Sequence, residues 1–271
     1  YDLRIVDEKY ISVDLKFEDL EKFFVEQINI FGNYITEEKV IRNSLIIDEG
    51  DPYNEFLFNK SISNIKSRGL FKSVKSKIKE SDNDKQKKII DITVVESPTG
   101  EIFAGAGTGT AGASIAAGIK EKNYLGKGIR LSTNLSVSES QIKGKFSVVN
   151  PNFRNSDRSL NTVIESTATD TLSTSGFKTS RTGFAIGTGF EQYNDLFINL
   201  DLSAYYEKLE TSSTASDHKK KQEGDYLENL LTYSLIFNKL DNNFQPTDGH
   251  KIGFEQVLPI YSDDLSIENT F

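Results

Sequence analysis

Several features that would narrow the function are missing from this sequence. The 271 residues include no cysteine, which excludes a disulfide framework and thiolate metal sites. His218 and His250 are the two histidines and lie far apart in sequence, so no histidine cluster for a metal is visible. The formal net charge is −8, whereas basic patches dominate nucleic-acid-binding domains, so we expect no nucleic-acid partner.

Long apolar runs are also missing. No stretch approaches roughly 18 consecutive apolar residues, which excludes a transmembrane helix. The same test does not exclude a membrane barrel, because barrel strands alternate apolar and polar residues and escape hydropathy windows.

Signatures of catalysis are absent as well. The run Gly105-x-Gly107-x-Gly109 superficially resembles a phosphate-binding loop, but no Lys-Ser/Thr pair follows it and no helix is indicated after it. No nucleophile–base pairing stands out. We therefore predict no enzymatic activity, no metal and no cofactor.

The junction Glu96-Ser97-Pro98-Thr99-Gly100 divides the chain, whose length suits about two domains. Pro98 cannot donate a ladder hydrogen bond and favours an extended Ser97, which suits the end of a strand. Tyr1 is not an initiator methionine, so we expect a removed targeting segment or an excerpt of a longer protein. The predicted parts are a hairpin at 1–20 that ends a preceding repeat, an α+β domain at 21–98, and part of a β-barrel at 99–271.

Residues 21–98 are predicted to fold in the order β-α-α-β-β. Thr36 is the expected N-cap of a first helix that continues to Leu45, and Asn54 is the expected N-cap of a second helix, which stops at Gly69. The expected strands are Phe24–Phe31, about Phe71–Lys79, and Lys88–Glu96.

From residue 99 onward, apolar and polar residues alternate in segment after segment. Each segment runs for roughly 9 to 13 residues, about the length that a tilted strand needs to cross a bilayer. Every second connection looks compact, whereas the others include the polar stretches Asp170–Ser180 and Thr211–Asp225. This asymmetry favours an outer-membrane barrel with short periplasmic turns and long outer loops.

Two sets of motifs carry a family resemblance. Ile30-Phe31-Gly32-Asn33, Gly50-Asp51-Pro52-Tyr53 and Gly69-Leu70-Phe71-Lys72-Ser73-Val74 resemble successive signatures of a POTRA domain. Asn123-Tyr124-Leu125-Gly126-Lys127-Gly128, Val149-Asn150-Pro151 and the segment from Asn238 to Gly249 resemble the early barrel turns of the Omp85 superfamily, and the last is most similar to its BamA branch. One departure is local, since Glu18-Asp19-Leu20-Glu21 stands where POTRA repeats often have a Glu-Gly pair.

The resemblance implies a fold. It is an α+β POTRA domain, with two helices on a three-stranded mixed sheet, followed by an antiparallel transmembrane β-barrel. Family barrels have about sixteen strands, and we predict about eight or nine here, so this part of the barrel is incomplete and cannot close by itself.

The resemblance also implies a lateral gate at the first barrel strand. Glycine weakens a strand, and a strand edge with unpaired backbone groups is a template for another strand. The alternative is that these glycines relieve crowding at a tight seam. The expected strand-pairing residues are Glu101, Ile102, Phe103, Ala104, Gly105, Ala106, Gly107, Thr108 and Gly109.

A second pairing edge is expected on the POTRA domain, at the strand Phe71–Lys79. It could receive extended client or accessory segments, although its lysines equally serve as protection against edge-to-edge aggregation. The residues in question are Phe71, Lys72, Ser73, Val74, Lys75, Ser76 and Lys77.

A purely structural role is expected for one late turn, which would set the entry of the next strand. Its residues are Asp241, Pro246, Thr247, Asp248 and Gly249.

For function, the resemblance implies an assembly and insertion factor for outer-membrane β-barrel proteins, located in the bacterial outer membrane with the POTRA part in the periplasm. The implied partners are unfolded outer-membrane protein precursors, accessory lipoproteins and outer-membrane lipids. Two alternatives remain. One is a translocation or secretion pore of the TamA-like or two-partner type, and the other is a passive porin with a periplasmic anchor.

Overall fold

The computed structural model describes residues 2–7, 10–14, 22–82, 84–109, 112–240, 246–261 and 268–270. Strands β1 (Asp2–Asp7) and β2 (Tyr10–Asp14) pair antiparallel, so the predicted hairpin is present. Its origin in a preceding repeat stays a prediction. The predicted linker around Glu18–Glu21 lies outside the described residues.

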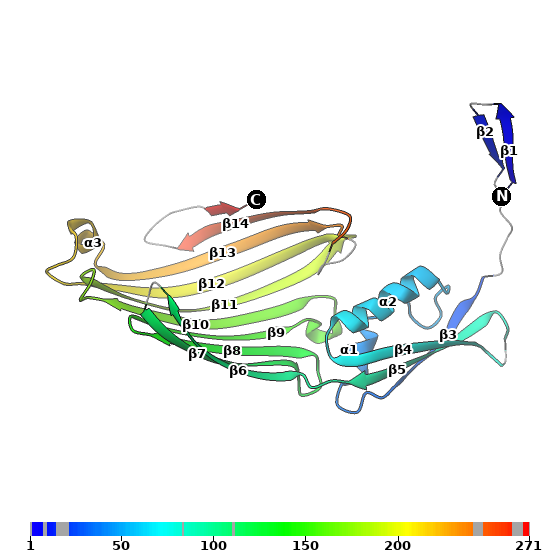
Figure 1. Cartoon of the computed structure of the whole chain (residues 1–271), viewed down its shortest axis with the longest axis horizontal. Helices are drawn as coiled ribbons and strands as arrows, with labels where there is room; N and C mark the ends of the chain where they lie inside the picture. The colour runs from blue at the N-terminus through cyan, green and yellow to red at the C-terminus, as the bar shows by residue number, and fades with distance from the viewer. Residues whose placement is uncertain are drawn as a thin grey trace.

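Residues 22–98 form a two-layer unit, called the α+β module below. Its elements are β3 (Phe24–Phe31), α1 (Glu38–Arg42), α2 (Glu55–Ser67), β4 (Phe71–Glu80) and β5 (Lys87–Glu96). The strand order is β3-β5-β4, with β3 parallel and β4 antiparallel to β5. The predicted β-α-α-β-β order is therefore confirmed, and both helices cover the same face of the sheet (Figure 1).

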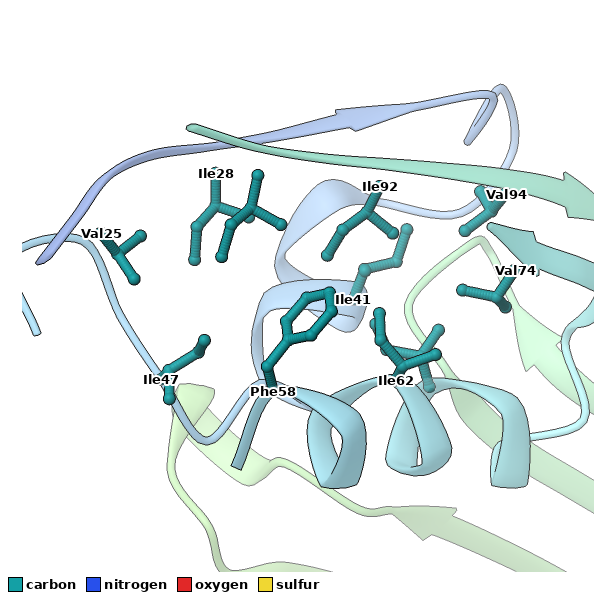
Figure 2. Close-up of a cluster of buried hydrophobic side chains, with 11 residues drawn as sticks. Val25, Ile28, Ile41, Ile47, Phe58, Ile62, Val74, Ile92 and Val94 are labelled. Carbon is teal, nitrogen blue, oxygen red and sulfur yellow. The ribbon is translucent and has the colours of Figure 1, made fainter. Parts of the chain in front are cut away.

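The core of the module lies between this sheet and the helices. Central strand β5 alternates so that Ile90, Ile92 and Val94 all face the helices and are buried. Figure 2 shows Ile92 and Val94 pointing from the sheet toward the helix side, where Phe58 and Ile62 meet them. The complete cluster is Val25, Ile28, Ile41, Ile47, Phe58, Ile62, Ile65, Val74, Ile90, Ile92 and Val94.

The predicted cap of α2 is confirmed, and that of α1 is wrong. Asn54 accepts a hydrogen bond from the Leu57 amide at 3.1 Å, and Gly69 follows the helix with a φ of 68°. Helix α1 instead begins at Glu38 after Glu37, whose side chain makes no capping bond. The helix also ends before Leu45. Thr36 is buried, and its hydroxyl accepts a hydrogen bond from the second part of the chain.

Residues 100–270 form one antiparallel sheet, called the curved sheet below, in which strands β6 to β15 are neighbours in sequence order. Nine strands are long and the tenth has three residues, against the eight or nine predicted. Figure 1 shows a trough-shaped wall with the α+β module at one end. The strands are β6 (Gly100–Gly109), β7 (Gly112–Tyr124), β8 (Ile129–Ser138), β9 (Gln141–Asn150), β10 (Ser159–Thr171), β11 (Phe177–Tyr193), β12 (Leu196–Thr211), β13 (Gly224–Asn238), β14 (Lys251–Tyr261) and β15 (Glu268–Thr270).

Two short helices lie in the connections of the curved sheet. They are η1 (Phe153–Asn155), between β9 and β10, and α3 (Asp217–Lys221), at the end of the sheet away from the α+β module (Figure 1). None of the helices in the described residues is both long enough and apolar enough to cross a membrane.

One face of the curved sheet is apolar and uncovered. Phe146, Ile164 and Phe184 are direct neighbours across β9, β10 and β11, and each is about half exposed. Among the described residues beyond 98, only Leu209 and Ala215 are hydrophobic and fully buried. This part of the chain therefore has no dry core of its own, as expected for a wall that faces lipid.

The opposite face carries polar and charged side chains. The Arg181 guanidinium lies 2.9 Å from Glu228 and 4.0 Å from the centre of the Tyr205 ring, and Lys145 lies 3.4 Å from Glu165. A Cβ added at Gly183 would overlap the Tyr205 side chain, so this face is crowded, as expected for the concave side of the wall.

The predicted difference in loop length between the two ends of the strands is wrong for this part of the chain. The stretch Asp170–Ser180 was expected to be a long loop, but Asp170 pairs with Lys178 and only residues 172–176 connect β10 to β11. Threonines along both strands favour continuation of the ladder. Connections at the end away from the α+β module include 139–140 and 212–223, and those at the near end include 125–128, 151–158, 194–195 and 239–250.

Candidate functional site: free strand edges and a domain joint

Strand β6 forms one edge of the curved sheet. It pairs with β7 from Gly100↔Glu121 to Gly109↔Gly112 and has no second partner among the described strands. All nine predicted pairing residues, Glu101 to Gly109, lie in this strand. Its outer backbone groups are the ones that a strand on the other side of β6 would use for pairing.

The two halves of β6 are held differently. Glu101 forms a 3.0 Å ion pair with Lys122, and the Phe103 ring lies over Gly118, with the Lys120 ammonium 5.4 Å from the ring centre. Beyond Phe103 the strand contains only alanine, glycine and threonine, which offer little side chain to pack. The strand is thus anchored near the α+β module and weakly held toward its far end.

The three glycines Gly105, Gly107 and Gly109 are not required by packing within this chain. A Cβ added at any of them would meet no atom within 4 Å. The alternative that these glycines relieve crowding at a tight seam concerns the strand on the other side of β6, and it stays open. These glycines leave the strand with few side-chain contacts.

Strand β4 is an edge of the module sheet and contains the predicted residues Phe71 to Lys77. The opposite edge, β3, is covered over its first residues by segment 49–53, since Val25 bonds to Asp51 and the Ile28 amide donates to Glu49. The described residues place no such cover on β4.

Lysines line β4, and one of them is engaged. Lys79 forms an ion pair with Asp91 on β5, and the hydrogen bonds from Lys79 and then Asn29 lower the pKa of Asp91. The Asp91 carboxylate thus stays charged on the sheet face away from the helices.

The predicted structural turn lies at the end of the curved sheet nearest the module. Asp241 falls outside the described residues. Gly249 has a φ of 99°, and a Cβ there would overlap the Lys239 carbonyl. The Lys239 amide donates to the His250 carbonyl at 2.9 Å. The structural role of Pro246, Thr247, Asp248 and Gly249 stays a prediction.

A third element, the joint between the two parts of the chain, was not predicted as a site. Buried Asn123, at the end of β7, donates from Nδ2 to the Thr36 hydroxyl at 2.9 Å and accepts from the Gly128 amide at 2.8 Å. The Glu37 amide donates to the Gly126 carbonyl at 2.8 Å. Gly126 has a φ of 72°, and a Cβ there would overlap the Ile35 carbonyl, so only glycine allows this approach.

Glu96 supports the module side of the joint. Its carboxylate accepts hydrogen bonds from the Thr36 amide at 2.6 Å and from the Ile35 amide at 3.0 Å. Burial by itself raises the pKa of Glu96, but the hydrogen bonds from Thr36, Ile35 and Tyr34 together outweigh it and leave the pKa below its usual value. Glu96 therefore stays ionised and fixes the loop that meets the β7–β8 turn.

Arg68 makes the second contact across the joint. Its Nη2 donates to Asn152 Oδ1 at 2.6 Å, and its Nε donates to the Ser44 hydroxyl at 2.5 Å. Burial, and then the positive charge of Arg130, lower the pKa of Arg68. Asn152 lies in the β9–β10 connection, so the module is fastened to two successive turns of the curved sheet.

The residues that form this joint had been noticed in the sequence, but they were given other roles. Asn123 to Gly128 was identified only as a family motif, and Thr36 was assigned to a helix cap. Both assignments overlooked that Thr36 and Asn123 are 87 positions apart and meet only in the folded chain.

Within the described ranges, no three His, Asp or Glu side chains are grouped as metal ligands. The features described are the β4 edge of the module sheet, the weakly packed strand β6, and the hydrogen-bonded joint between the two parts of the chain.

Comparison with known proteins places both parts of the chain. A family model described as the Omp85 superfamily domain matches residues 123–267, and the POTRA model, described as a surface antigen variable number repeat, matches residues 23–97. An outer membrane protein assembly factor BamA from Neorickettsia risticii is 27% identical over 252 residues, which cover 89% of this chain and 33% of that protein. The chain spans about a third of the length of the curated relatives that it matches.

Solved structures show the same fold. BamA from Haemophilus ducreyi lacking POTRA domains 1–3 aligns with a TM-score of 0.69 at 21% identity, covering 97% of this chain and 54% of that one. CdiB from Acinetobacter baumannii aligns with a TM-score of 0.57 at 9% identity, covering 91% of this chain and 47% of that one.

Proposed function

The chain is a BamA-like member of the Omp85 superfamily, and from this premise we propose that it works as an assembly and insertion factor for outer-membrane β-barrel proteins. It is a bacterial outer-membrane protein with its α+β module, a POTRA domain, in the periplasm. In the proposed function, the module receives unfolded precursors and the curved sheet, part of the barrel wall, directs their strands into the membrane.

The observation that carries the proposal is the weak side-chain packing of β6 beyond Phe103, where only alanine, glycine and threonine follow. An extended precursor segment would pair its backbone with the outer edge of this strand, which requires no particular side chains and therefore suits many clients. The anchors at Glu101 and Phe103 would keep the near end of β6 in place while the far end, from Ala104 to Gly109, separates from its neighbours.

The β4 edge offers the module a means of receiving precursors. A segment added beside β4 would continue the three-stranded sheet, and the lysines of β4 would favour segments or accessory lipoproteins with acidic residues. Outer-membrane lipids would surround the apolar face of the wall. The proposed work needs only strand pairing and local disturbance of the membrane.

Crosslinking tests the proposal directly, because the 271 residues contain no cysteine. We would place Ala104→Cys or Ala106→Cys in the full-length protein and express it with a stalled client barrel that carries a cysteine in its terminal strand. We expect a disulfide adduct with the client. Ala117→Cys is the matched control, since it lies opposite Ala104 on β7, which is paired on both sides. No client adduct at 104 or 106, or equal adducts at 117, would contradict the proposal.

The second candidate is a secretion pore, which the structural likeness to CdiB leaves open. Depletion of the protein separates the two functions. Loss of an assembly factor should lower the level of outer-membrane barrel proteins in general, whereas loss of a secretion pore should abolish one or a few exports. Quantitative proteomics of the outer membrane and of the medium measures both.

A further inference from the structure

Three large exposed side chains lie on the two segments that meet at the joint. Tyr34 is 94% exposed, Ile35 is 72% exposed and Leu125 is 67% exposed. Tyr34 and Ile35 lie in the loop between β3 and α1, and Leu125 lies in the turn between β7 and β8. We call these three residues the interfacial cluster. They contribute to neither the core of the module nor the hydrogen bonds of the joint through their side chains.

The interfacial cluster is held in place. The Ile35 and Thr36 amides are bound by Glu96, the Glu37 amide donates to the Gly126 carbonyl, and the Ile35 carbonyl lies directly against Gly126. Its two segments therefore stay side by side even though they come from different domains. Exposed apolar side chains on a fixed backbone are a candidate binding surface.

The end of the barrel wall shows which environment surrounds this cluster. Tyr124 and Tyr193 lie at the ends of β7 and β11 nearest the module, and both are exposed. Tyr124 is paired with Ile129 and Tyr193 with Leu196, which places both on the apolar face of the sheet. Tyrosines at the ends of barrel strands form the aromatic girdle at the level of the lipid headgroups.

Leu125 directly follows Tyr124, so the interfacial cluster adjoins the periplasmic end of the lipid-facing band. We propose that Tyr34, Ile35 and Leu125 insert into the periplasmic leaflet of the outer membrane, so that the module touches the bilayer at this loop. Continuity with the apolar face favours lipid as the occupant over a protein partner. The inference rests on the membrane location of the protein and not on its proposed role in assembly.

Tryptophan fluorescence tests this contact, because the 271 residues contain no tryptophan. The Tyr34→Trp variant would be prepared in the full-length protein, with any tryptophan outside these residues replaced by phenylalanine. It would be reconstituted into phosphatidylethanolamine–phosphatidylglycerol vesicles with and without lipids brominated near the headgroup. The Tyr193→Trp variant serves as the girdle reference, and Phe56→Trp, on helix α2 and 75% exposed, serves as the solvent reference.

We expect brominated lipid to quench Y34W at least half as strongly as Y193W and to leave F56W unchanged. Ile35→Trp should behave like Y34W, which guards against a local effect of one substitution. Quenching of Y34W and I35W no greater than that of F56W would overturn the proposal. A blue-shifted but unquenched emission would also overturn it, because a protein partner would then cover the cluster. Absence of quenching in Y193W would show that Tyr193 does not lie at the lipid headgroups, and this result would also overturn the proposal.

Discussion

The α+β module and the curved sheet both alternate apolar and polar residues, but the apolar residues are buried in the module and exposed in the curved sheet. In β5, the alternating Ile90, Ile92 and Val94 are buried under helices. In β11, the alternating Phe184 and Ile186 are exposed on an open face. The period of the pattern determines which side chains share a face, and the partner layer, helices or lipid, determines what that face contacts.

The largest expected effect comes from the dry core. Ile92→Ala should lower the free energy of unfolding of the module by about 2–5 kcal/mol, because it leaves a cavity where the structure is close-packed. Amide hydrogen exchange of β5 in the full-length protein measures this. The control is Val95→Ala on the same strand, whose side chain faces away from the helices and should cost less than about 1 kcal/mol. Equal losses for both variants would contradict the division into core and open faces.

The second largest effect is expected from a charge placed on the apolar face of the curved sheet. Phe184→Arg places a charge near the middle of β11 on the apolar face, and it should destabilise the membrane-inserted protein by roughly 2–4 kcal/mol. Val163→Arg, on the neighbouring strand but on the polar face, should cost far less. Urea titrations in lipid vesicles compare the two. A larger cost for Val163→Arg would reverse our assignment of the faces.

The third effect concerns the joint, where the two regions meet. Asn123→Ala removes the acceptor for the Gly128 amide and the donor to Thr36, and it should cost about 1–3 kcal/mol locally. Faster amide exchange at Gly128 reports the loss. Thr36→Val should behave similarly and Thr36→Ser nearly like wild type, since serine keeps the hydroxyl. Full additivity of Thr36→Val and Asn123→Ala would mean that the two side chains do not act as a pair.

The smallest expected effect is a pH dependence. The pKa of Glu96 is lower in the folded protein than its ordinary value of 4.5, so its stabilisation of the joint is fully present above that value. It is lost as the pH falls below 4.5 through the lower folded pKa. Protection of the Ile35 and Thr36 amides, corrected for intrinsic exchange, should fall over this range in wild type. In Glu96→Gln the protection should be weaker and should no longer change with pH.

Much of the fold was predictable because local signals and long-range packing agreed. Asn54 caps α2, Gly69 ends it and β5 alternates as expected, because no distant residue competes for these groups. Thr36 failed as a predicted cap because a buried asparagine from another domain takes its hydroxyl. Asp170–Ser180 failed as a loop because cross-strand pairing outweighed its polar composition.

The candidate site was predictable only in part. The glycine run of β6 and the lysines of β4 are visible in the sequence, and the structure places both on sheet edges. The coverage of β3 by segment 49–53, the fastening of Arg68 to Asn152 and the exposure of Tyr34 each depend on contacts between distant segments. No pattern within one segment carries such information.

The placement of the joint has a mechanical consequence. Its hydrogen bonds reach the β7–β8 and β9–β10 connections, which belong to the strands that follow β6 in the sheet. The hydrogen bonds across the joint therefore attach the module to the flank of the wall that β7 to β10 form. A force applied to the periplasmic domain would therefore reach this flank of the wall directly.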